Sequence, residues 1–403
     1  MDKVISILIF LVIFGVLVIS HEGGHFLVAR ANGIRVIEFT IGLGPQIFHT
    51  VRNGTVFSVR LFPFGGACIF DGMLDDDEDE EEDEDADNET HRTDAPKVSV
   101  FNMKKITSPD GSLIKNAEEA DESEDAKQQA EFVAQGVPFP EAKVWARIAT
   151  ILAGPFFNFI VGFLLALIIT AFTPWDYPVV DGFTETSPAR EAGLQEGDLI
   201  LRMNGDRITM ASEVSLNSQF NTGEDITLLV ERDGSRETIT FAPSFDAQQN
   251  RYFMGVYVGR FDKVEGAAII PYAFDTVRYY IEWTYRSLGL LITGRLGADA
   301  LSGPVGMAQM VDETYVTAAT YGLSAVVLSM IELALLLSVN LGVMNLLPIP
   351  ALDGGRLLFL FIELIRGKPV PREKEGYVNI AGMVFLVALM AFVLFNDIRK
   401  LIG

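Results

Sequence analysis

Four long apolar stretches constrain the fold of this 403-residue chain more than any other feature. A helix needs about 20 predominantly apolar residues to cross the hydrocarbon core of a bilayer. The stretches run approximately over residues 4–20, 148–173, 321–347 and 376–396, and the third alone carries a charge, Glu332. We therefore expect a multi-pass α-helical membrane protein with four transmembrane helices. A signal peptide is the alternative for the first stretch, but the apolar run is long and a His-Glu-Gly-Gly-His motif lies where cleavage would fall.

The charged residues are segregated from the apolar ones. The chain has 31 basic and 54 acidic residues, a net charge of −23, and thirteen of the acids lie between Asp75 and Glu89, so the remainder carries −23 + 13 = −10. Residues 71–140 are predicted to be an acidic, disordered cytoplasmic insertion, in which His91 is solvated. Ion buffering and partner docking are less favoured alternatives. No basic cluster is present, so we expect no nucleic-acid partner. The single cysteine, Cys68, excludes an intrachain disulfide framework.

Basic residues in the short connections predict the orientation, because cytoplasmic loops are enriched in lysine and arginine. They follow the first apolar stretch, precede the second, and lie between the third and fourth; they are Arg30, Arg35, Lys143, Arg147, Arg356, Arg366, Lys368, Arg372 and Lys374. We therefore expect these connections in the cytoplasm. Both termini and residues 174–320 would then lie outside the cell.

A small β element is expected directly after the first helix. Asn53-Gly54 is a strong signal for a tight hairpin turn, and Phe57, Val59 and Leu61 alternate with polar residues as in a half-buried strand. Residues 42–45 and 63–66 are rich in glycine and proline and are predicted to be turns that bracket the hairpin.

A mixed β/α domain is expected after the second helix. Strands are predicted at 198–203, 226–232 and 238–241, and a short capped helix at 187–194. The next segment, 261–320, looks amphipathic and carries Tyr279, Tyr280, Trp283 and Tyr285. These aromatic residues fit a bilayer surface and packing against the β domain equally well.

The sequence His21-Glu22-Gly23-Gly24-His25 is an HExxH motif at the end of the first apolar stretch. Residues four apart share one face of a helix, so both imidazoles can bind one metal ion while Glu22 flanks a water molecule. Ionisable residues within a transmembrane helix are costly, at about 2.5–3.5 kcal/mol each, and a bound Zn²⁺ would compensate for them. A hydrogen-bonded His–Glu cluster without metal is the alternative.

A zinc ion held by two histidines needs a third protein ligand and an open position for water. Asp353, in the segment NLLPIPALDGG, is the preferred candidate, because it ends the third stretch on the side where HEGGH ends the first. Pro348 and Pro350 break the helix there, and unwound backbone at membrane depth is tolerated where it lines a cavity. Glu332 is the competing ligand, about six helical turns away.

Peptide hydrolysis is the chemistry that this set of residues predicts. Zinc would lower the pKa of a water molecule and polarise the scissile carbonyl group, while Glu22 accepts the proton of the water and passes it to the leaving amine. Asn340 and Asn345 lie in the same apolar stretch as the segment that ends at Asp353. Interhelical hydrogen bonding and a role at the active site are equally compatible with their position.

HEGGH in a first transmembrane helix and NLLPIPALDGG at the end of a later one resemble the site-2 protease family of intramembrane zinc metalloproteases (peptidase family M50), in particular its bacterial regulator of sigma-E protease type. The likeness covers most of the chain. Further similar segments are residues 39–45 and 58–66, typical of a membrane-associated β hairpin, Ala153–Asn158, Leu301–Gly306, and 187–205, typical of a PDZ domain.

The resemblance implies zinc bound by His21, His25 and Asp353, with Glu22 as the catalytic base. It also implies that Asn345, Asn340 and the prolines Pro348 and Pro350 contact the unwound substrate, and that the hairpin adds to the substrate as a strand. The implied partners are transmembrane protein substrates, such as anti-sigma factors or remnant signal peptides, an upstream site-1-type protease, and the lipid bilayer of the cell membrane. A single PDZ-like segment and the acidic insertion depart from the family's usual pattern.

The expected organisation comprises eight segments. They are a transmembrane helix with HExxH (1–30), a membrane-associated β element (31–70), the acidic insertion (71–140), a transmembrane helix (144–173), an extracytoplasmic PDZ domain (175–260), an interfacial segment (261–320), a transmembrane helix with the third ligand (321–353) and a last transmembrane helix (376–399). A non-catalytic PDZ membrane scaffold is the main rival function. A metal transporter is a weaker one, because no internal repeat is visible.

Overall fold

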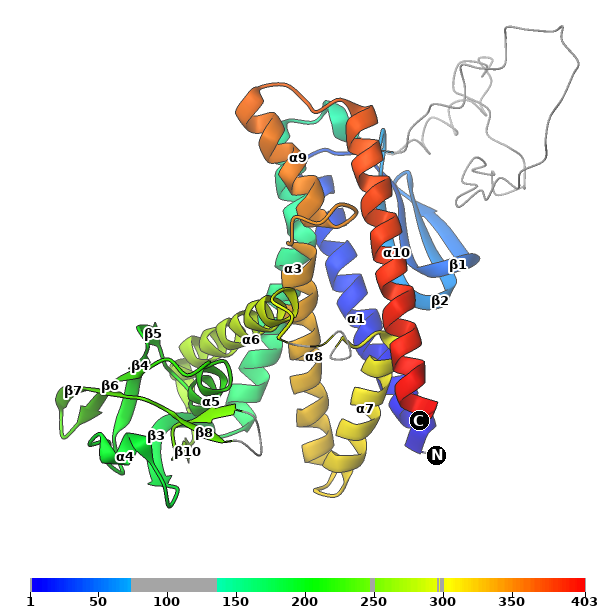
Figure 1. Ribbon diagram of the computed structural model, residues 1–403. Coiled ribbons are helices and arrows are strands. Elements are labelled where there is room, and N and C mark those ends of the chain that lie inside the picture. The colour runs from blue at the N-terminus through cyan, green and yellow to red at the C-terminus, as the bar shows by residue number, and fades with distance from the viewer. Residues whose placement is uncertain (1, 74–135, 247–250, 296, 298–300, 403) are drawn as a thin grey trace, which may run out of the picture. The chain divides into compact units, whose positions relative to one another are not determined.

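The computed structural model describes residues 2–73, 136–246, 251–295, 297 and 301–402 (Figure 1). Most of the predicted acidic insertion, with the tract from Asp75 to Glu89 and with His91, lies outside these residues. The chain forms two compact units, one of residues 26–147 and one of residues 1–25 together with 148–403.

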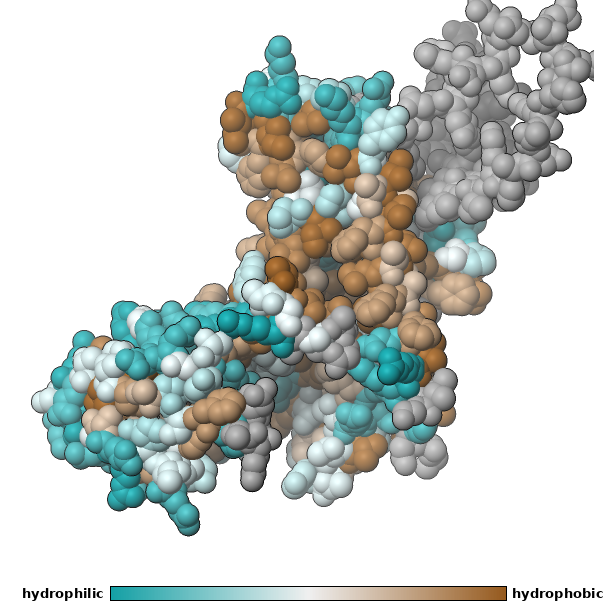
Figure 2. Space-filling view, in the orientation of Figure 1, coloured by the Kyte–Doolittle hydropathy of each residue, from teal (hydrophilic) through white to brown (hydrophobic). Residues whose placement is uncertain are grey.

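The four predicted apolar helices are present, and each is long and apolar enough to cross a membrane. They are α1 (Asp2–Ala31), α3 (Val144–Phe172), α8 (Leu323–Asn345) and α10 (Arg372–Ile402). Many of their large apolar side chains are exposed, for example Val12 of α1, Phe172 of α3 and Phe395 of α10. In Figure 2 brown, hydrophobic residues cover much of the visible helical surface, whereas teal residues dominate the β-rich domain. This distribution identifies a membrane protein.

The unit of residues 26–147 contains a hairpin of β1 (Val36–Arg52) and β2 (Thr55–Phe70) and, after residues that the structure does not describe, the 3-10 turn η1 (Phe139–Glu141). The predicted tight turn is present, with Asn53 at φ 50° and Gly54 at φ 73°. The strands are longer than expected, because the segments 42–45 and 63–66 lie within them and are not turns that bracket the hairpin. The register is shifted there, and Glu38–Ile41 pair both with Val56–Val59 and with residues 66–69.

Burial in the hairpin follows the alternation at Phe57, which is half-buried against Phe26 and Phe39, but reverses it at Val59 and Leu61. Val59 and Leu61 are exposed, at 42% and 52%, whereas Ser58 is 2% exposed. Ser58 donates a hydrogen bond of 2.5 Å to Glu38, and Arg60 forms an ion pair with the same carboxylate. This internal polar network satisfies the buried polar groups, and Val59 and Leu61 remain on the surface of the hairpin.

A β-rich domain follows α3. Its main sheet has the strand order β10-β3-β4-β6-β7, β5 pairs with β4, and β8 and β9 form a separate ladder. The strands are β3 (Trp175–Phe183), β4 (Leu199–Met203), β5 (Asp206–Arg207), β6 (Ile226–Arg232), β7 (Ser235–Phe241), β8 (Ser244–Asp246), β9 (Arg251–Phe253) and β10 (Val256–Asp262). The three predicted strands correspond to β4, β6 and β7. The core between the sheet and its helices contains Ile200, Leu228 and Val214 among others.

Two short helices belong to this domain, α4 (Pro188–Glu191) and α5 (Ala211–Gln219). The predicted cap of the first is present, because the Ser187 side chain accepts a hydrogen bond from the backbone N–H of Arg190. In α5, Glu213 is only 1% exposed and forms an ion pair with Arg278 of the next helix, α6 (Ile269–Ile292). This pair connects the β-rich domain to the helix that follows it.

The segment 261–320 forms the 3-10 turn η2 (Gly266–Ala268) and two helices, α6 (Ile269–Ile292) and α7 (Pro304–Ala319). Of the four aromatic residues named above, Tyr279 packs against a cluster with Trp175 of the β domain, whereas Tyr280 and Trp283 pack against apolar residues of α3 and α8. Tyr272 of α6 also contacts Trp175, at 4.5 Å between ring centroids. Tyr280 is 8% exposed, whereas Tyr285 is 49% exposed.

Helix α7 packs with α1 and α8 in one apolar cluster that includes Phe10, Val311 and Met330. Its first turn is held by Asp397 of α10, which accepts hydrogen bonds from the backbone N–H groups of Gly303 and Gly306 at 3.0 and 2.8 Å. A carboxylate at this position satisfies otherwise unpaired N–H groups at a helix N-terminus.

Helix α8 ends at Asn345, as the prolines predict, and the chain then runs irregularly to α9 (Asp353–Arg366). Proline disfavours the helical conformation of the residue before it, so the segment with Pro348 and Pro350 cannot continue the helix. Ala351 in this segment has a left-handed backbone, with φ 72°. Asp353 therefore begins a new helix rather than ending α8.

Candidate metal centre

Helix α1 places His21 and His25 on one face, as the four-residue spacing requires. The two imidazole rings lie edge to face, with 4.9 Å between their centroids. Both residues are buried, at 8% and 5% exposure. Glu22 follows His21 in the same helix and is half-buried.

Asp353 completes the cluster from the first turn of α9. Its Oδ2 atom lies 3.1 Å from Nε2 of His21 and 3.3 Å from Nε2 of His25. These ligand atoms lie within 4.8 Å of one another, and theirs is the one cluster of at least three histidine, cysteine, aspartate or glutamate side chains that could hold a metal ion in the described parts of the chain. Oδ2 of Asp353 is shielded and accepts no hydrogen bond. A shielded oxygen of this kind needs a cation.

Helix α3 provides the hydrogen-bond partners of the Nδ1 atoms of both rings. Nδ1 of His25 lies 2.8 Å from the carbonyl oxygen of Thr150, so this nitrogen carries the proton and donates. The proton position leaves Nε2 of His25 with a free lone pair directed at Asp353. A hydrogen bond of this type fixes the tautomer and the ring orientation of a metal-binding histidine.

Asn158 has the same role for His21. Its carboxamide lies 3.1 Å from Nδ1 of His21 and 3.2 Å from Oγ of Ser20. The Ser20 hydroxyl donates to Oδ1 of Asn158 and also lies 2.9 Å from the carbonyl oxygen of Leu17, and Nδ2 of Asn158 faces Nδ1 of His21. A metal ion on Nε2 of His21 requires the proton on Nδ1, and the carboxamide would then turn so that Oδ1 accepts from Nδ1–H. In that tautomer, Nε2 of His21 also has a free lone pair.

Two glycines allow α1 and α3 to approach closely at the site. A Cβ atom on Gly154 would lie 2.2 Å from Nε2 of His25, and one on Gly24 would lie 2.5 Å from the carbonyl oxygen of Ala153. Neither position has room for a side chain while the imidazoles and the backbone of α3 stay in place.

The other predicted site residues lie at different distances from the cluster. Nδ2 of Asn345, at the end of α8, is 3.5 Å from Nε2 of His21. Asn340 accepts a hydrogen bond from Thr284 of α6, which favours the interhelical role for this residue. Pro348 is exposed, and Pro350 lies against Gly382 of α10.

Glu332, the competing metal ligand, accepts a hydrogen bond of 3.2 Å from Tyr280 and lies outside the His–His–Asp cluster. The preference for Asp353 over Glu332 therefore agrees with the geometry.

Sequence reasoning missed the contributions of Thr150, Gly154 and Asn158. The segment Ala153–Asn158 carried a signal, since a glycine, a proline and a polar asparagine are unusual within an uncharged apolar helix. Its function became apparent only when the packing of α3 on α1 was known.

Comparison with known proteins agrees with this geometry. The profile of peptidase family M50 matches residues 9–389. The zinc metalloprotease RasP of Geobacillus kaustophilus is 35% identical, over 98% of both chains. The regulator of sigma-W protease RasP of Bacillus subtilis is 34% identical, and the probable protease eep of Enterococcus faecalis is 32% identical, each over 98% of this chain and 99% of the relative.

Among solved structures, the PDZ domain of the SdrC-like protein from Listeria monocytogenes aligns with 21% of this chain and 88% of that domain, at 16% identity and a TM-score of 0.19. The family profile and the full-length relatives lead to one assignment. The chain belongs to peptidase family M50, the site-2 protease family of zinc metalloproteases.

Proposed function

We propose that this protein is an intramembrane zinc metalloprotease in which His21, His25 and Asp353 hold the metal and Glu22 is the general base. The proposal rests on the close approach of three ligand atoms, Nε2 of His21, Nε2 of His25 and Oδ2 of Asp353. Two zinc ligands at about 2.1 Å in a tetrahedron lie about 3.4 Å apart. The separations of 3.1 and 3.3 Å between Asp353 and the imidazoles match this value.

Three protein ligands leave one position of a tetrahedral ion open, as in catalytic rather than structural zinc sites. When bound, zinc supplies Lewis-acid chemistry: it polarises the scissile carbonyl group and lowers the pKa of a water molecule. Glu22 removes a proton from the attacking water and delivers it to the departing amine. Hydrogen bonds donated by Nδ1–H of His25 to the carbonyl oxygen of Thr150 and by Nδ1–H of His21 to Asn158 would hold the imidazoles in the required tautomers.

Asn345 has a separate function. Its amide lies 3.5 Å from the metal-facing nitrogen of His21 and therefore at the place where a substrate carbonyl group must approach. Nδ2–H of Asn345 can donate to that carbonyl and hold the unwound substrate backbone. The irregular segment 346–352, with Pro348 and Pro350, would line the same approach, since a helix there would cover it.

The substrates are transmembrane segments of membrane proteins. The site is built on apolar helices, and a peptide bond must be brought to it within the lipid-facing part of the molecule. The name of the Bacillus subtilis relative, regulator of sigma-W protease, points to control of a sigma factor, so a membrane-bound anti-sigma factor is the substrate class that we favour. An upstream site-1-type protease would make the first cut outside the membrane.

The orientation in the membrane follows from the basic residues. Arg30 at the end of α1 and Arg366 at the end of α9 favour a cytoplasmic position for these ends, with the metal site near the cytoplasmic face. The β-rich domain would then be extracytoplasmic. The hairpin of β1 and β2 carries exposed Leu43, Ile47 and Phe48, which support contact with the bilayer and pairing with an extended substrate.

The β-rich domain has the features of a PDZ domain. Edge strand β10 and helix α5 border a groove of about 510 Å³, whose lining includes Val256, Val258, Val214 and Ser218. A peptide could add to β10 as a further strand, which is how PDZ domains bind their ligands. A non-catalytic PDZ scaffold is the second candidate function, but such a scaffold has no use for three convergent metal ligands in apolar helices.

The test is co-expression with a membrane-anchored anti-sigma factor already truncated outside the membrane. We expect cleavage by the parent, none by Glu22→Gln, and about one zinc ion per chain in both purified proteins. Equal cleavage by Glu22→Gln would contradict the mechanism, and a parent that purifies without zinc would favour the scaffold. The Glu22→Gln protein should also retain its substrate, which mass spectrometry would identify.

A further inference from the structure

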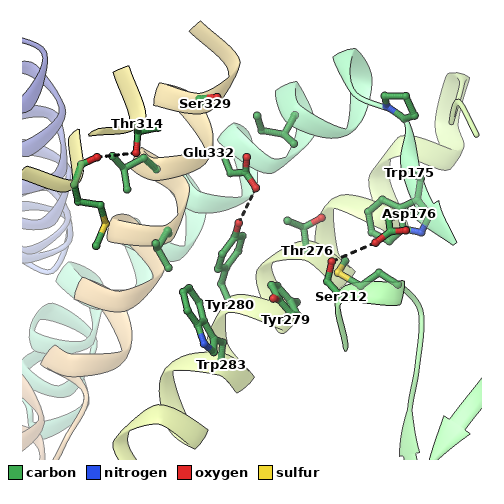
Figure 3. A pocket seen from close by; sticks show the side chains of 16 residues that line it. Trp175, Asp176, Ser212, Thr276, Tyr279, Tyr280, Trp283, Thr314, Ser329 and Glu332 are labelled. Atoms are coloured by element: carbon green, nitrogen blue, oxygen red, sulfur yellow. Dashed lines mark hydrogen bonds between the residues drawn. The ribbon is translucent and has the colours of Figure 1, made fainter. Parts of the chain in front are cut away.

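A second polar site lies away from the metal, on the same helix α8. A cavity of about 480 Å³ is bordered by residues from α3, β3, α5, α6, α7 and α8 (Figure 3). Glu332 projects into it from α8, and Tyr279, Tyr280 and Trp283 of α6 lie opposite. Asp176 and Trp175 close the end next to the β-rich domain.

Glu332 is the one charged residue in the sequence of α8. It is exposed to the cavity, and its hydrogen bond comes from the neutral hydroxyl group of Tyr280, 3.2 Å away. No lysine, arginine or histidine is among the described residues that line the cavity. The two nearby arginines of α6 are engaged elsewhere, Arg278 with Glu213 and Arg286 with Asp206. A carboxylate at membrane depth without a cationic partner is costly and marks a functional site.

The chemistry of the cavity favours an organic cation over a metal ion. Within the described residues, Glu332 belongs to no cluster of three side chains that could hold a metal. The aromatic rings of Tyr279, Tyr280 and Trp283 instead offer the faces that attract ammonium and guanidinium groups. Calcium and magnesium need six or more oxygen ligands, which an aromatic wall does not supply.

The position of the cavity relates it to the active site. Glu332 and Asn345 belong to one unbroken helix and are 345 − 332 = 13 residues apart, which is about 20 Å at 1.5 Å per residue. Asn345 adjoins His21. Thirteen residues make about 3.6 turns, so Glu332 lies about 140° around α8 from Asn345, and a membrane segment with its scissile bond at the metal reaches Glu332 if it crosses α8 obliquely toward α6. A helical substrate covers this distance in about 13 residues, and an extended one in about six.

We infer that this cavity is a subsite for a lysine or arginine side chain of the substrate, six to thirteen residues from the scissile bond on the side of the β-rich domain. Glu332 pairs with the cation, and the rings of α6 stack on it. The inference rests on the proposed proteolytic function. It adds that the position of a positive charge in the substrate helps to determine which peptide bond is cut.

The test uses one membrane-anchored substrate with a single lysine moved along the outer part of its membrane segment, and a glutamine at each position as the matched substrate. Protease and substrate are reconstituted in vesicles of phosphatidylglycerol. With the parent, lysine within the window should raise the cleavage rate about tenfold over glutamine, as a charge-assisted contact in a partly desolvated site does. Lysine outside the window should give no increase.

Variants identify the residue responsible. Glu332→Gln should remove the lysine preference and keep cleavage of the glutamine substrate, whose rate also reports that the variant is folded. Glu332→Lys should reverse the preference toward a substrate with glutamate at the same position. Glu282→Gln is the control, because this carboxylate of α6 pairs with Arg278 and does not line the cavity; it should keep the lysine preference.

The outcomes separate this inference from the proposed function. Equal cleavage of lysine and glutamine substrates at every position would overturn the subsite and leave the protease intact. If the parent cleaved neither the lysine nor the glutamine substrates, the proteolytic function itself would be overturned. If Glu332→Gln slowed all substrates equally, and ethanolamine lipids in the vesicles accelerated the parent, the cation would be a lipid headgroup and the subsite would be wrong.

Discussion

The carboxamide of Asn158 in α3 lies 3.1 Å from Nδ1 of His21 in α1, on the side of the ring opposite Asp353. A residue of a different helix therefore contacts the ring nitrogen of His21 that would face away from the proposed metal ion. With zinc on Nε2, Nδ1 of His21 must carry the proton, and Asn158 would accept it through its carboxamide oxygen.

Asn158→Ala should weaken zinc binding about 10- to 100-fold, since hydrogen bonds to metal-binding histidines typically contribute that much. Competition with a chromogenic chelator on purified protein would measure the change. Asn340→Ala is the matched control, because this asparagine also lies in an apolar helix but contacts Thr284; its zinc affinity should equal that of the parent. Unchanged affinity in Asn158→Ala would contradict the proposed hydrogen bond.

Gly154→Ala should abolish stoichiometric zinc binding. The new methyl group would lie 2.2 Å from Nε2 of His25, so either the imidazole must leave its position or α3 must move away from α1. Gly15→Ala is the control within α1, since a Cβ atom there meets no other atom within 4 Å. That change should preserve zinc content and alter stability by no more than about 1 kcal/mol in the stabilising direction. Zinc analysis and thermal unfolding in detergent would measure both effects.

Asp397→Ala should destabilise the helical part of the molecule by about 1–3 kcal/mol, because two buried N–H groups at the start of α7 lose their acceptor. The adjacent Asn396 provides the comparison, since its shielded Nδ2 atom has no hydrogen-bond partner. Asn396→Leu should therefore be neutral or stabilising. Thermal or denaturant unfolding of the purified proteins would show the difference, and equal effects of the two variants would refute the role of Asp397.

The phenol of Tyr272 should lose its proton at an unusually high pH. A hydrogen bond with Tyr177 and partial burial raise the pKa of Tyr272 to about 12. Since this value exceeds the pKa of about 10 of an unfolded tyrosine, the contribution of Tyr272 to stability is fully present below about pH 10 and is lost as the pH rises toward 12. Burial also raises the pKa of Tyr279 and Tyr280, so ultraviolet titration of phenolate should show several late tyrosines in the parent, and Tyr177→Phe should return one of them toward pH 10. An unchanged number of late tyrosines in Tyr177→Phe would contradict the hydrogen bond.

Much of the fold could be predicted because its signals are local. The four apolar helices, the turn at Asn53-Gly54, the cap at Ser187 and the end of α8 before Pro348 depend on hydropathy, backbone preferences and hydrogen bonds between near neighbours. The buried face of the hairpin could not be predicted, since the Glu38–Ser58–Arg60 network involves partners twenty or more residues apart.

The sequence by itself determined that His21 and His25 share one face of an apolar helix, because the pitch of the helix is a local property. Only the tertiary structure decided that Asp353 and not Glu332 faces them, that Asn158 orients one ring, and that Glu332 opens instead into a cavity lined by aromatic residues. These contacts join helices that are distant in the chain, and the helices are positioned by packing, in which Gly24 and Gly154 set how closely α1 and α3 approach.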